Sequence, residues 1–483
     1  MLRCIINFPQ MKTIFVTMPN VSVFRNLYFF PKSFFNQLED ALKLKKDTRV
    51  VFLVHKGDYE KYIWFFKPHL SDRVIVEEVL VDPKKNIWRK FFRFLYAYLV
   101  YTGTTKVLTT MGMRVDDPPA AANRHVFIIR ILLANTFGRS RFVKRKVVPF
   151  LYPRVFTERP FEDLFTRYKP RLIFTTNLYG EFDTFLLAEA KRRGVKSIGM
   201  LANWDHVDKY FLPLQSDVLL VQNEQVKSAA YRYQAYENHE LKCTGYPYFD
   251  FIIDPHFVMK REDILAHLGF PAAGRYILYI SGTAYCPDEP DVIENILSWI
   301  DQGVFGPNIH LVLRPYLGGR SKDKEFDRKK FEGFKNHPRV RFYTEKAWNS
   351  MSDAVNFMNV MRHASVVMTV YSTAFLEAAV LDRPLVAAVF DGYHKRPYHR
   401  SIRRFEEFEH FKDFIKTGAI KRTFSFEQLK YALAAYLKNP AIDADKRAYV
   451  REKVCYKLDG HATKRTLDFV LDMLDNSAEA SPK

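Results

Sequence analysis

Short apolar segments alternate with helical segments along almost the whole sequence, and this pattern constrains the fold more than any other feature. Apolar runs at Lys12–Pro19, Arg49–Gly57 and Arg73–Val81 are predicted to be buried strands, and helical stretches separate them. Parallel strands need long crossover connections, which are usually helices. The alternation therefore predicts an α/β fold with a mostly parallel sheet.

The alternation starts a second time in the middle of the chain. The strand "RYILYISGT" (Arg275–Thr283) is followed by a helix at Asp291–Ile300 and by strands at Ile309–Pro315, Ser365–Val370 and Leu385–Phe390. A chain of 483 residues is also too long for one ordinary core. We therefore expect two doubly wound, Rossmann-like domains facing a cleft. Their predicted bounds are 1–250 and 251–440, with closing helices and a tail at 441–483.

The amino-acid composition limits the cellular compartment and the kinds of partner that we expect. A net charge of +20 favours an anionic partner, which could be a nucleic acid, an acidic membrane face or a phosphorylated substrate. The four cysteines lie far apart and show no metal-ligand spacing, which fits a reducing compartment. Residues 1–10 are predicted to be an extension without a signal-type core, and about the last eight residues to be disordered. No segment is predicted to span a bilayer, so we expect a cytoplasmic protein.

The stretch "TVYSTAFLEAAVLDRP" is the most informative motif. An apolar strand stops at Tyr371, Ser372 and Thr373, and a short helix follows. Ligands in open α/β sheets sit beyond the carboxyl ends of the strands. We expect a hydroxyl of Ser372 or Thr373 to cap the helix and to leave first-turn amides for an anion such as a phosphate.

Glu377 is the polar residue of that otherwise apolar helix. A capping box needs an acid three residues after the hydroxyl, but positions 375 and 376 are Phe and Leu. Two interpretations remain. The carboxylate could accept hydrogen bonds from a ribose diol, or it could belong to an ordinary solvated face.

Together with five other stretches, this motif resembles the donor-binding half of GT-B glycosyltransferases. The branch it resembles contains the CDP-glycerol glycerophosphotransferases and the capsule and cell-surface polysaccharide transferases. The other stretches are "GTAYCPDEPDVIENIL", "LVLRPY", "KLDGHATKRTLDFVLDML", and the pair "GMLANWDHVDKY" and "CTGYPYFD". The resemblance runs from about residue 170 to 475. It implies an N-terminal acceptor domain and a C-terminal nucleotide-donor domain.

The resemblance implies transfer of a sugar or polyol phosphate from a nucleotide-sugar or CDP-polyol donor to a glycan or lipid-linked acceptor. Ser281, Gly282 and Thr283 end a strand, where hydroxyls and a small residue suit a pyrophosphate. An ordinary turn is the alternative. Arg314 ends another strand and could neutralise a leaving phosphate or form a surface ion pair. The family often has His after the following Pro, whereas this chain has Tyr316.

Two further segments carry charged residues at predicted strand ends. The basic loop Asp391–Arg404 could contact phosphate or could simply be solvated. An acceptor hydroxyl needs a general base, for which Asp205 or His206 is our candidate. Glu181 and Asp183 are second choices, and they could instead cap a helix. No metal is required by the pattern, because Asp116 and Asp117 do not form an Asp-x-Asp after a strand.

The segment Lys84–Tyr101 combines clustered cations with many aromatic residues. It could be a buried helix with snorkelling cations. Alternatively it could lie on anionic lipid, which would make the protein peripheral on the inner face of the membrane and would suit a lipid-linked acceptor. The basic runs Gly138–Pro149 and Lys191–Lys196 could join the same face.

Three alternative functions stay open at this point. A non-hydrolysing UDP-sugar 2-epimerase shares the two-domain architecture, although an acidic chain would suit it better. The net charge of +20 suggests a nucleic-acid-binding protein as a second alternative. However, the sequence contains no recognisable nucleic-acid-binding motif, and its positive charge is dispersed. A catalytically inactive scaffold is the third.

Overall fold

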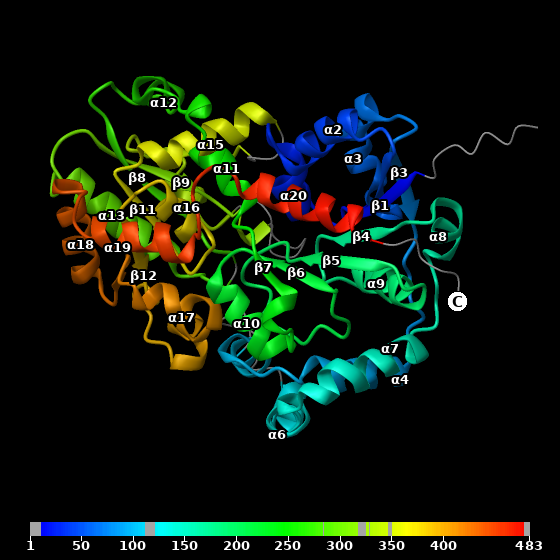
Figure 1. Cartoon of the computed structure of the whole chain (residues 1–483). Coiled ribbons are helices and arrows are strands. Elements are labelled where there is room, and N and C mark those ends of the chain that lie inside the picture. The colour runs from blue at the N-terminus through cyan, green and yellow to red at the C-terminus, as the bar shows by residue number, and fades with distance from the viewer. Residues whose placement is uncertain are drawn as a thin grey trace, which may run out of the picture. The chain divides into compact units, whose positions relative to one another are not determined.

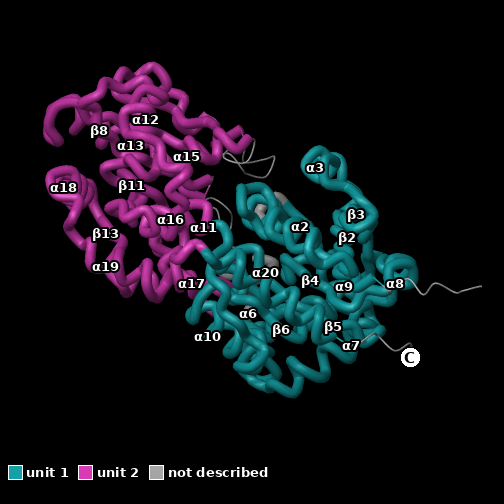
Figure 2. Tube along the Cα trace, turned by 45° about the horizontal axis from the view of Figure 1, so that its top comes forward, with its two compact units in different colours: residues 1–101, 129–248, 461–483 teal, residues 102–128, 249–460 magenta. Residues whose placement is uncertain are grey.

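The computed structural model describes residues 11–111, 121–283, 285–316, 325–327, 329–345 and 350–477. The chain divides into two compact units (Figure 2). Unit 1 comprises residues 1–101, 129–248 and 461–483, and unit 2 comprises residues 102–128 and 249–460. Each unit is built around its own parallel sheet, which confirms the predicted α/β fold with two Rossmann-like domains.

In unit 1 the described strands form a seven-stranded parallel sheet in the order β3-β2-β1-β4-β5-β6-β7 (Figure 1). The strands are β1 (Lys12–Thr17), β2 (Thr48–His55), β3 (Val74–Val79), β4 (Leu172–Thr175), β5 (Lys196–Met200), β6 (Val218–Val221) and β7 (Leu241–Cys243). The central strands are buried along almost their whole length. Burial on both faces explains why they appear in the sequence as continuous apolar runs rather than alternating ones.

Helices cover both faces of this sheet. The helices of unit 1 are α1 (Val21–Phe24), α2 (Phe34–Leu44), α3 (Tyr59–Phe66), α4 (Ile87–Ala97), α7 (Val148–Val155), α8 (Glu162–Tyr168), α9 (Glu181–Arg192), α10 (Glu224–Gln234) and α20 (Ala462–Asp475). Helix α6 (Ala121–Asn135) and helix α11 (Pro247–Ile253) each cross a boundary between the units. The rings of Phe15 on β1 and Phe165 on α8 meet edge to face at 5.2 Å, opposite the face that α2 covers.

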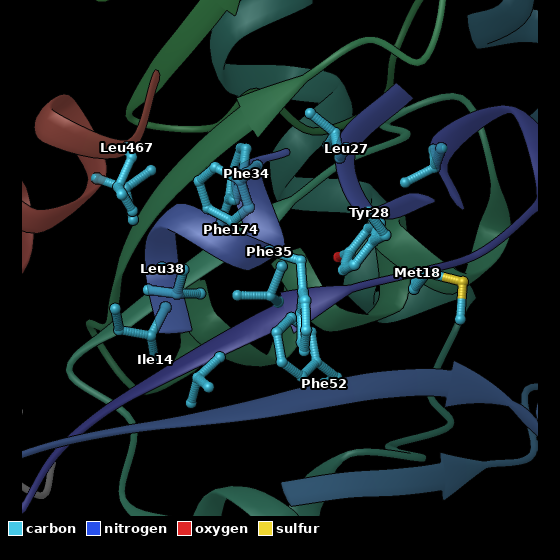
Figure 3. Close-up of a cluster of buried hydrophobic side chains, with 14 of the residues drawn as sticks. Ile14, Met18, Leu27, Tyr28, Phe34, Phe35, Leu38, Phe52, Phe174 and Leu467 are labelled. Carbon is cyan, nitrogen blue, oxygen red and sulfur yellow. The ribbon is translucent and has the colours of Figure 1, made fainter. Parts of the chain in front are cut away.

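The largest aromatic cluster lies between the sheet and α2 (Figure 3). Ile14 and Phe52 from the strands meet Phe34 and Phe35 from the helix, and all four are almost completely buried. Leu467 of α20 joins the same cluster from the far end of the sequence. Burial of such large side chains, each contributing about 1.5–3 kcal/mol, fixes α2 and α20 on one face of the sheet.

Unit 2 repeats the design with a six-stranded parallel sheet, counted over the described residues, in the order β10-β9-β8-β11-β12-β13. The strands are β8 (Arg275–Ile280), β9 (Ile309–Arg314), β10 (Val340–Phe342), β11 (Val366–Thr369), β12 (Leu385–Ala388) and β13 (Ile420–Thr423). The predicted strands of this half agree with the observed ones to within a few residues at each end, because each is a buried apolar run bounded by turn residues.

The helices of unit 2 are α5 (Gly103–Lys106), α12 (Arg261–His267), α13 (Glu289–Asp301), α15 (Met351–His363), α16 (Ala374–Val380), α17 (Glu409–Lys416), α18 (Phe426–Lys438) and α19 (Ala444–Tyr449). Helices α13 and α18 pack on one face of the sheet through a single apolar cluster. On the opposite face the hydroxyl of Tyr276 donates to the carbonyl of Val360 on α15. Among the residues that the structure describes, no helix is both long and apolar enough to cross a bilayer.

The observed units depart from the predicted domain bounds in two places. The first boundary, between Tyr248 and Phe249, is close to the predicted one at residue 250. However, the start of the segment 102–128 joins unit 2, where Lys106 forms an ion pair with Glu407 at 2.9 Å. The C-terminal helix returns to unit 1, where Asp475 binds Lys12 at 2.9 Å and Lys45 at 2.5 Å. These partners are hundreds of residues apart, so no local pattern announces them.

Three predictions fall on residues outside the described ranges. They concern the extension at residues 1–10, the acidic pair Asp116 and Asp117, and the end of the C-terminal tail at 478–483.

Both sheets reverse their strand order at one point. In unit 1 the chain lays down β1, β2 and β3 and then places β4 on the other side of β1. Hydrogen bonds connect the residues at the ends of β1 and β4. The Thr17 and Thr176 hydroxyl oxygens lie 3.1 Å apart, and the Asn177 amide donates to Asp183 Oδ2 at 2.6 Å. Asp183 is completely buried, and its Oδ1 has no hydrogen-bond partner among the described residues.

This burial predicts a specific pH dependence of stability. Burial raises the pKa of Asp183 from 3.8 to about 7. The folded protein therefore keeps the proton between about pH 4 and pH 7, where the unfolded carboxyl has lost it. The contribution of this group to stability is present at low pH and is lost as the pH rises through about 7. At about 1.4 kcal/mol per pKa unit, the loss is on the order of 4 kcal/mol.

The variant Asp183→Asn cannot ionise and should not show this loss. The free energy of unfolding is measured in urea at pH 5 and pH 8. Relative to the wild type, the variant should be more stable at pH 8 than at pH 5. Asp163→Asn, at an exposed position on α8, is the matched control. An identical pH dependence for Asp183→Asn and the wild type would contradict the assignment.

Candidate functional site

The reversal of strand order in unit 2 brings two of the predicted site segments together. Strands β8 and β11 are neighbours, with Ile280 opposite Thr369, although β9 and β10 lie between them in the sequence. Ser281–Thr283 follows β8, and Tyr371–Thr373 follows β11. Connections leave a switch point in opposite directions, which makes it the usual ligand site of an open α/β sheet.

The turn after β11 satisfies its own backbone groups. Ser372 Oγ accepts from the amide of Ala374 at 3.3 Å, and the carbonyl of Ser372 accepts from Phe375 at 3.2 Å. The amide of Leu376 donates to the carbonyl of Thr373 at 3.0 Å. The N-cap residue of α16 is Thr373, whose side chain makes no capping hydrogen bond, and Ser372 binds a first-turn amide from one position earlier. The prediction that the first-turn amides stay open for an anion is wrong for all three of these amides.

The accessible side of α16 is narrow and contains Glu377. Within the helix every residue except Glu377 is buried, and Thr373, four positions earlier, is exposed. Residues four apart lie on the same face of a helix. Thr373 and Glu377 therefore form one accessible line that begins at the switch point.

Tyr371 points into the protein instead of toward a ligand. Its side chain is buried, and its hydroxyl donates to Glu406 Oε1 at 2.7 Å. Its ring packs against Phe375 and Phe411. This corrects the expectation that Tyr371 is available to a donor, because its ring and its hydroxyl both hold the turn in place.

The three predicted site residues in the loop after β8 make different contacts. Ser281 is buried, and its hydroxyl has no hydrogen-bond partner in the described part of the chain. The Thr283 hydroxyl donates to Asp327 Oδ2 at 2.7 Å, and the Gly282 amide donates to Glu289 Oε1 at 2.9 Å. The expectation that hydroxyls of this loop meet a ligand therefore applies to Ser281, whereas the Thr283 hydroxyl is committed to a carboxylate.

Gly282 is required by close packing. A Cβ atom at this position would lie 2.7 Å from Val370 Cγ2 and 2.8 Å from Cys286 Sγ. These distances are shorter than real Cβ contacts, so any larger residue would push the turns after β8 and β11 apart. The glycine thus fixes the width of the switch point.

Sequence reasoning missed a buried ion pair that holds the loop. Lys330 Nζ lies 2.5 Å from Glu289 Oε2, and both side chains are almost inaccessible. The same ammonium donates to the carbonyls of Gly282 at 3.1 Å and Cys286 at 3.0 Å. Glu289 also accepts from the hydroxyl of Tyr279 at 3.0 Å. Glu289 and Lys330 are 41 positions apart, and neither stands in a recognisable pattern.

The space directly beneath this edge is small. A cavity of about 20 Å³ lies among Tyr285, Asp288, Val370 and Asp391. A volume of this size holds about one water molecule. This cavity is too small for a nucleotide, and Thr373 and Glu377 lie on the accessible side of the edge.

Arg314 is buried at the end of β9. Its guanidinium lies 3.6 Å from the ring centre of Phe357 and donates to the carbonyl of Glu345 at 3.2 Å. Arg314 is therefore buried rather than on the surface, where the stacked ring and the carbonyl orient it inside the unit.

The basic loop Asp391–Arg404 is partly fixed and partly open. Arg396 forms a bidentate ion pair with Asp288 at 2.7 and 2.8 Å, and Arg404 is completely buried. Lys395, Arg400 and Arg403 are exposed. The loop thus turns three cations outward, while Arg396 holds it against the beginning of α13.

The candidate base lies in unit 1, on the turn after β5. Asp205 Oδ2 binds Lys209 Nζ at 2.8 Å, and His206 Nε2 lies 3.8 Å from Asp205 Oδ1. The His206 ring stacks on Tyr179, with ring centres 5.3 Å apart. The second choices fit less well, because Asp183 is completely buried and Glu181 pairs with Arg93.

The chain is similar to one protein-family model and to several solved structures. Residues 333–472 match the family model described as CDP-glycerol:poly(glycerophosphate) glycerophosphotransferase. The match includes the turn at Tyr371–Glu377, whereas Ser281–Thr283 and Arg314 lie outside it. No curated protein matches the chain.

Solved structures show the fold. A protein from Listeria monocytogenes assigned as a UDP-N-acetylglucosamine 2-epimerase has a TM-score of 0.54 at 12% identity, over 98% of this chain and 99% of that chain. The UDP-GlcNAc 2-epimerase from Neisseria meningitidis, bound to UDP-GlcNAc, has a TM-score of 0.52 at 10% identity, over 96% and 100%. At these identities the solved structures show the fold alone, and the family match over residues 333–472 agrees with the predicted resemblance to the CDP-glycerol glycerophosphotransferase branch.

The buried ion pair leads to a stability prediction. Lys330→Met leaves Glu289 buried without its counter-charge, which should cost about 3–5 kcal/mol of unfolding free energy. Urea unfolding measures this loss. Lys329→Met is the matched control, because Lys329 pairs with Glu325 on the surface and should contribute less than about 1 kcal/mol. Equal effects of the two substitutions would show that the buried pair does not hold the loop.

Proposed function

We propose that the protein transfers a sugar or a polyol phosphate from a nucleotide-activated donor to a cell-surface glycan or lipid-linked acceptor. One observation carries the proposal. The segment that matches the glycerophosphotransferase model contains Thr373 and Glu377, which are accessible beside the switch point of the unit 2 sheet. We therefore place the nucleotide donor at this edge of unit 2.

Each polar group at the edge has a proposed role. Glu377 accepts hydrogen bonds from the ribose diol, and the hydroxyls of Ser281 and Thr373 donate to the diphosphate. The exposed cations Lys395, Arg400 and Arg403 neutralise the leaving group in place of a metal ion. Charged groups make the stronger hydrogen bonds, so Glu377 should dominate recognition of the nucleotide.

In the proposed reaction, Asp205 or His206 removes the proton from an acceptor hydroxyl. The oxygen then attacks the anomeric carbon of a sugar donor and releases a nucleoside diphosphate. With a CDP-polyol donor it attacks phosphorus and releases CMP. In either case one bond to the acceptor oxygen forms as the bond to the nucleotide breaks.

Helix α4 supports the proposed membrane association. Arg89 is buried and binds Glu158 at 2.5 Å, whereas Trp88 and Ile87 are 75% and 72% exposed. This is the reverse of a helix that buries its apolar side and lets cations snorkel outward. Trp88 and Ile87, with Phe91 one turn later, therefore form an outward-facing apolar strip.

Neighbouring helices extend this strip. Helix α4 packs beside α7, and Arg130 of α6 lies over the Tyr98 ring, which follows α4 (Figure 1). We call the exposed apolar side chains of these helices the apolar surface of unit 1; they are Ile87, Trp88, Phe91, Ile129, Leu132, Phe150 and Leu151. Exposed cations stand among them, namely Lys84, Lys85, Lys90, Lys146 and Arg154. Apolar side chains bordered by cations match an anionic lipid surface.

A UDP-sugar 2-epimerase is the second candidate function. Solved epimerases share this fold, although identities of 10–12% carry the fold alone. Product analysis with UDP-GlcNAc separates the two. Epimerisation without transfer would favour the epimerase, and transfer to an acceptor with release of nucleotide would favour the transferase.

The donor site gives a direct prediction. In a thermal-shift screen with CDP, UDP, GDP and CMP, at least one nucleotide should stabilise the protein. Glu377→Ala should remove most of that shift, corresponding to about 10- to 100-fold weaker binding. The melting temperature without nucleotide should hardly change. Glu427→Ala, at an exposed carboxylate in the first turn of α18, is the control. An unchanged shift in Glu377→Ala would place the ribose elsewhere.

The apolar surface of unit 1 gives a second prediction. The protein should co-sediment with anionic vesicles, and the bound fraction should fall as salt is raised. Trp88→Ser should reduce binding several-fold because it removes an exposed aromatic side chain from the surface. Tyr431→Ser, at a 68% exposed aromatic residue on α18, should not. Sedimentation that is independent of anionic lipid and salt would refute the proposed attachment.

A further inference from the structure

The segments that lead into three neighbouring strands of unit 2 meet at the amino edge of its sheet. The amide of Ser365, just before β11, donates to the carbonyl of Tyr276 on β8 at 2.9 Å. The amide of Val367 on β11 donates to the carbonyl of Pro384, just before β12, also at 2.9 Å. The proposed donor site lies at the opposite ends of β8 and β11, so the amino edge is separate from it.

Three arginines and a histidine come together at this edge. Arg362 and His363 stand in the last turn of α15, just before β11, and Arg383 stands just before β12. Arg261 is tied to Gly274, just before β8, by a hydrogen bond of 2.6 Å. All four basic side chains are half-buried. We call Arg261, Arg362 and Arg383 the amino-edge arginines.

Backbone carbonyls hold the other two amino-edge arginines in place as well. Arg362 donates to the carbonyl of Ile252 at 2.7 Å. Arg383 donates to the carbonyl of Leu381 at 3.0 Å through Nε, which leaves both of its terminal nitrogens without a hydrogen-bond partner in the described part of the chain. Arg362 Nε is enclosed and has no partner there either. A guanidinium has five N–H donors, so these side chains keep donors for a ligand.

No carboxylate among the described residues forms an ion pair with the amino-edge arginines. Asp382 is next to Arg383 in the sequence, but it binds Arg447 at 2.8 Å and Arg451 at 2.9 Å. A half-buried charge without a counter-charge loses hydration that nothing replaces. An anion bound at this edge would supply the counter-charge.

The pKa of His363 reflects this uncompensated charge. Burial lowers the pKa, and the charges of all three amino-edge arginines lower it further. Burial and the charge of Arg383 likewise lower the pKa of Arg362. His363 Nε2 donates to the carbonyl of Met259 at 2.8 Å, which fixes the ring beside the arginines. A bound anion would therefore favour the protonated form of His363.

We propose that the amino-edge arginines bind a phosphate dianion, either free or as the end group of a small phosphorylated molecule. The three guanidiniums come from the beginning of α12, the end of α15 and the turn before β12, and they therefore reach a ligand from different directions. A carboxylate offers its oxygens in one plane, whereas a phosphate offers strong acceptors in several directions. The ligand takes no part in the transfer reaction, so the inference does not rest on the proposed function.

The test measures binding of inorganic phosphate to the full-length protein by isothermal titration calorimetry at pH 8 and constant ionic strength. Arg362→Gln and Arg383→Gln should each weaken binding by about 10- to 100-fold, because each removes a charged hydrogen-bond donor. Arg341→Gln is the matched control. Arg341 also donates to backbone carbonyls, those of Leu268 and Gly269, but it lies on β10, which β9 separates from β8. Its loss should leave the phosphate affinity unchanged.

A second measurement follows the wild type. NMR titration gives the pKa of His363 with and without saturating sulfate, which keeps its two negative charges over the range in which histidine titrates. The pKa should rise when sulfate binds, because the dianion offsets the repulsion from the arginines. His363→Gln identifies the resonance.

Methyl phosphate distinguishes the two sources of the phosphate group. Binding as tight as that of inorganic phosphate assigns the site to a phosphorylated molecule. A clear preference for inorganic phosphate assigns it to the free ion, and either result supports the site.

Four results would overturn the proposal. The first is that the wild type binds neither inorganic phosphate nor methyl phosphate, and the second is an unchanged pKa of His363 in saturating sulfate. The third is an equal phosphate affinity in Arg341→Gln and Arg383→Gln. The fourth is phosphate binding that Glu377→Ala removes and Arg383→Gln keeps, which would place the ion at the proposed donor edge. The proposed transferase activity fails separately, if no nucleotide binds at Glu377 while phosphate still binds at the amino edge.

Discussion

The parallel pairing of every strand in each sheet is the constraint on which the rest of this structure depends. Parallel strands end at the same edge, so turns that are far apart in the sequence meet there. In unit 2 the reversal between β9-β8 and β11-β12 brings Ser281 close to the turn that precedes Glu377. The buried pair Glu289 and Lys330 then fixes the loop after β8, and the absence of a side chain at Gly282 sets its distance from Val370.

The two units share a topology, but the groups at the point where the strand order reverses differ. In unit 1 the reversal between β1 and β4 is closed by hydrogen bonds of Thr17, Thr176 and Asp183, so the strand ends there are filled with protein groups. In unit 2 the corresponding edge leaves the Ser281 hydroxyl without a partner among the described residues and leaves Thr373 and Glu377 accessible. The same fold thus stabilises one edge internally and leaves polar groups accessible at the other.

Helix α4 connects the remaining features of unit 1. It buries Arg89 against Glu158 and turns Trp88 outward, which costs solvation of apolar surface unless something covers it. The same helix also contributes Lys90 and Arg93 to the wall of a pocket of about 540 Å³ within unit 1.

The sequence by itself determined the two parallel sheets and the approximate ends of their strands, because strands buried on both faces must be continuous apolar runs bounded by turn residues. It also placed Ser281 at the end of one strand and Glu377 in the helix that follows another. Only the tertiary structure decided which of the neighbouring side chains are buried and which stay accessible. Tyr371 and Thr283 turn inward to Glu406 and Asp327, and Lys330 reaches Glu289 across 41 positions. Side-chain direction depends on partners brought together by the fold, and local patterns contain no information about them.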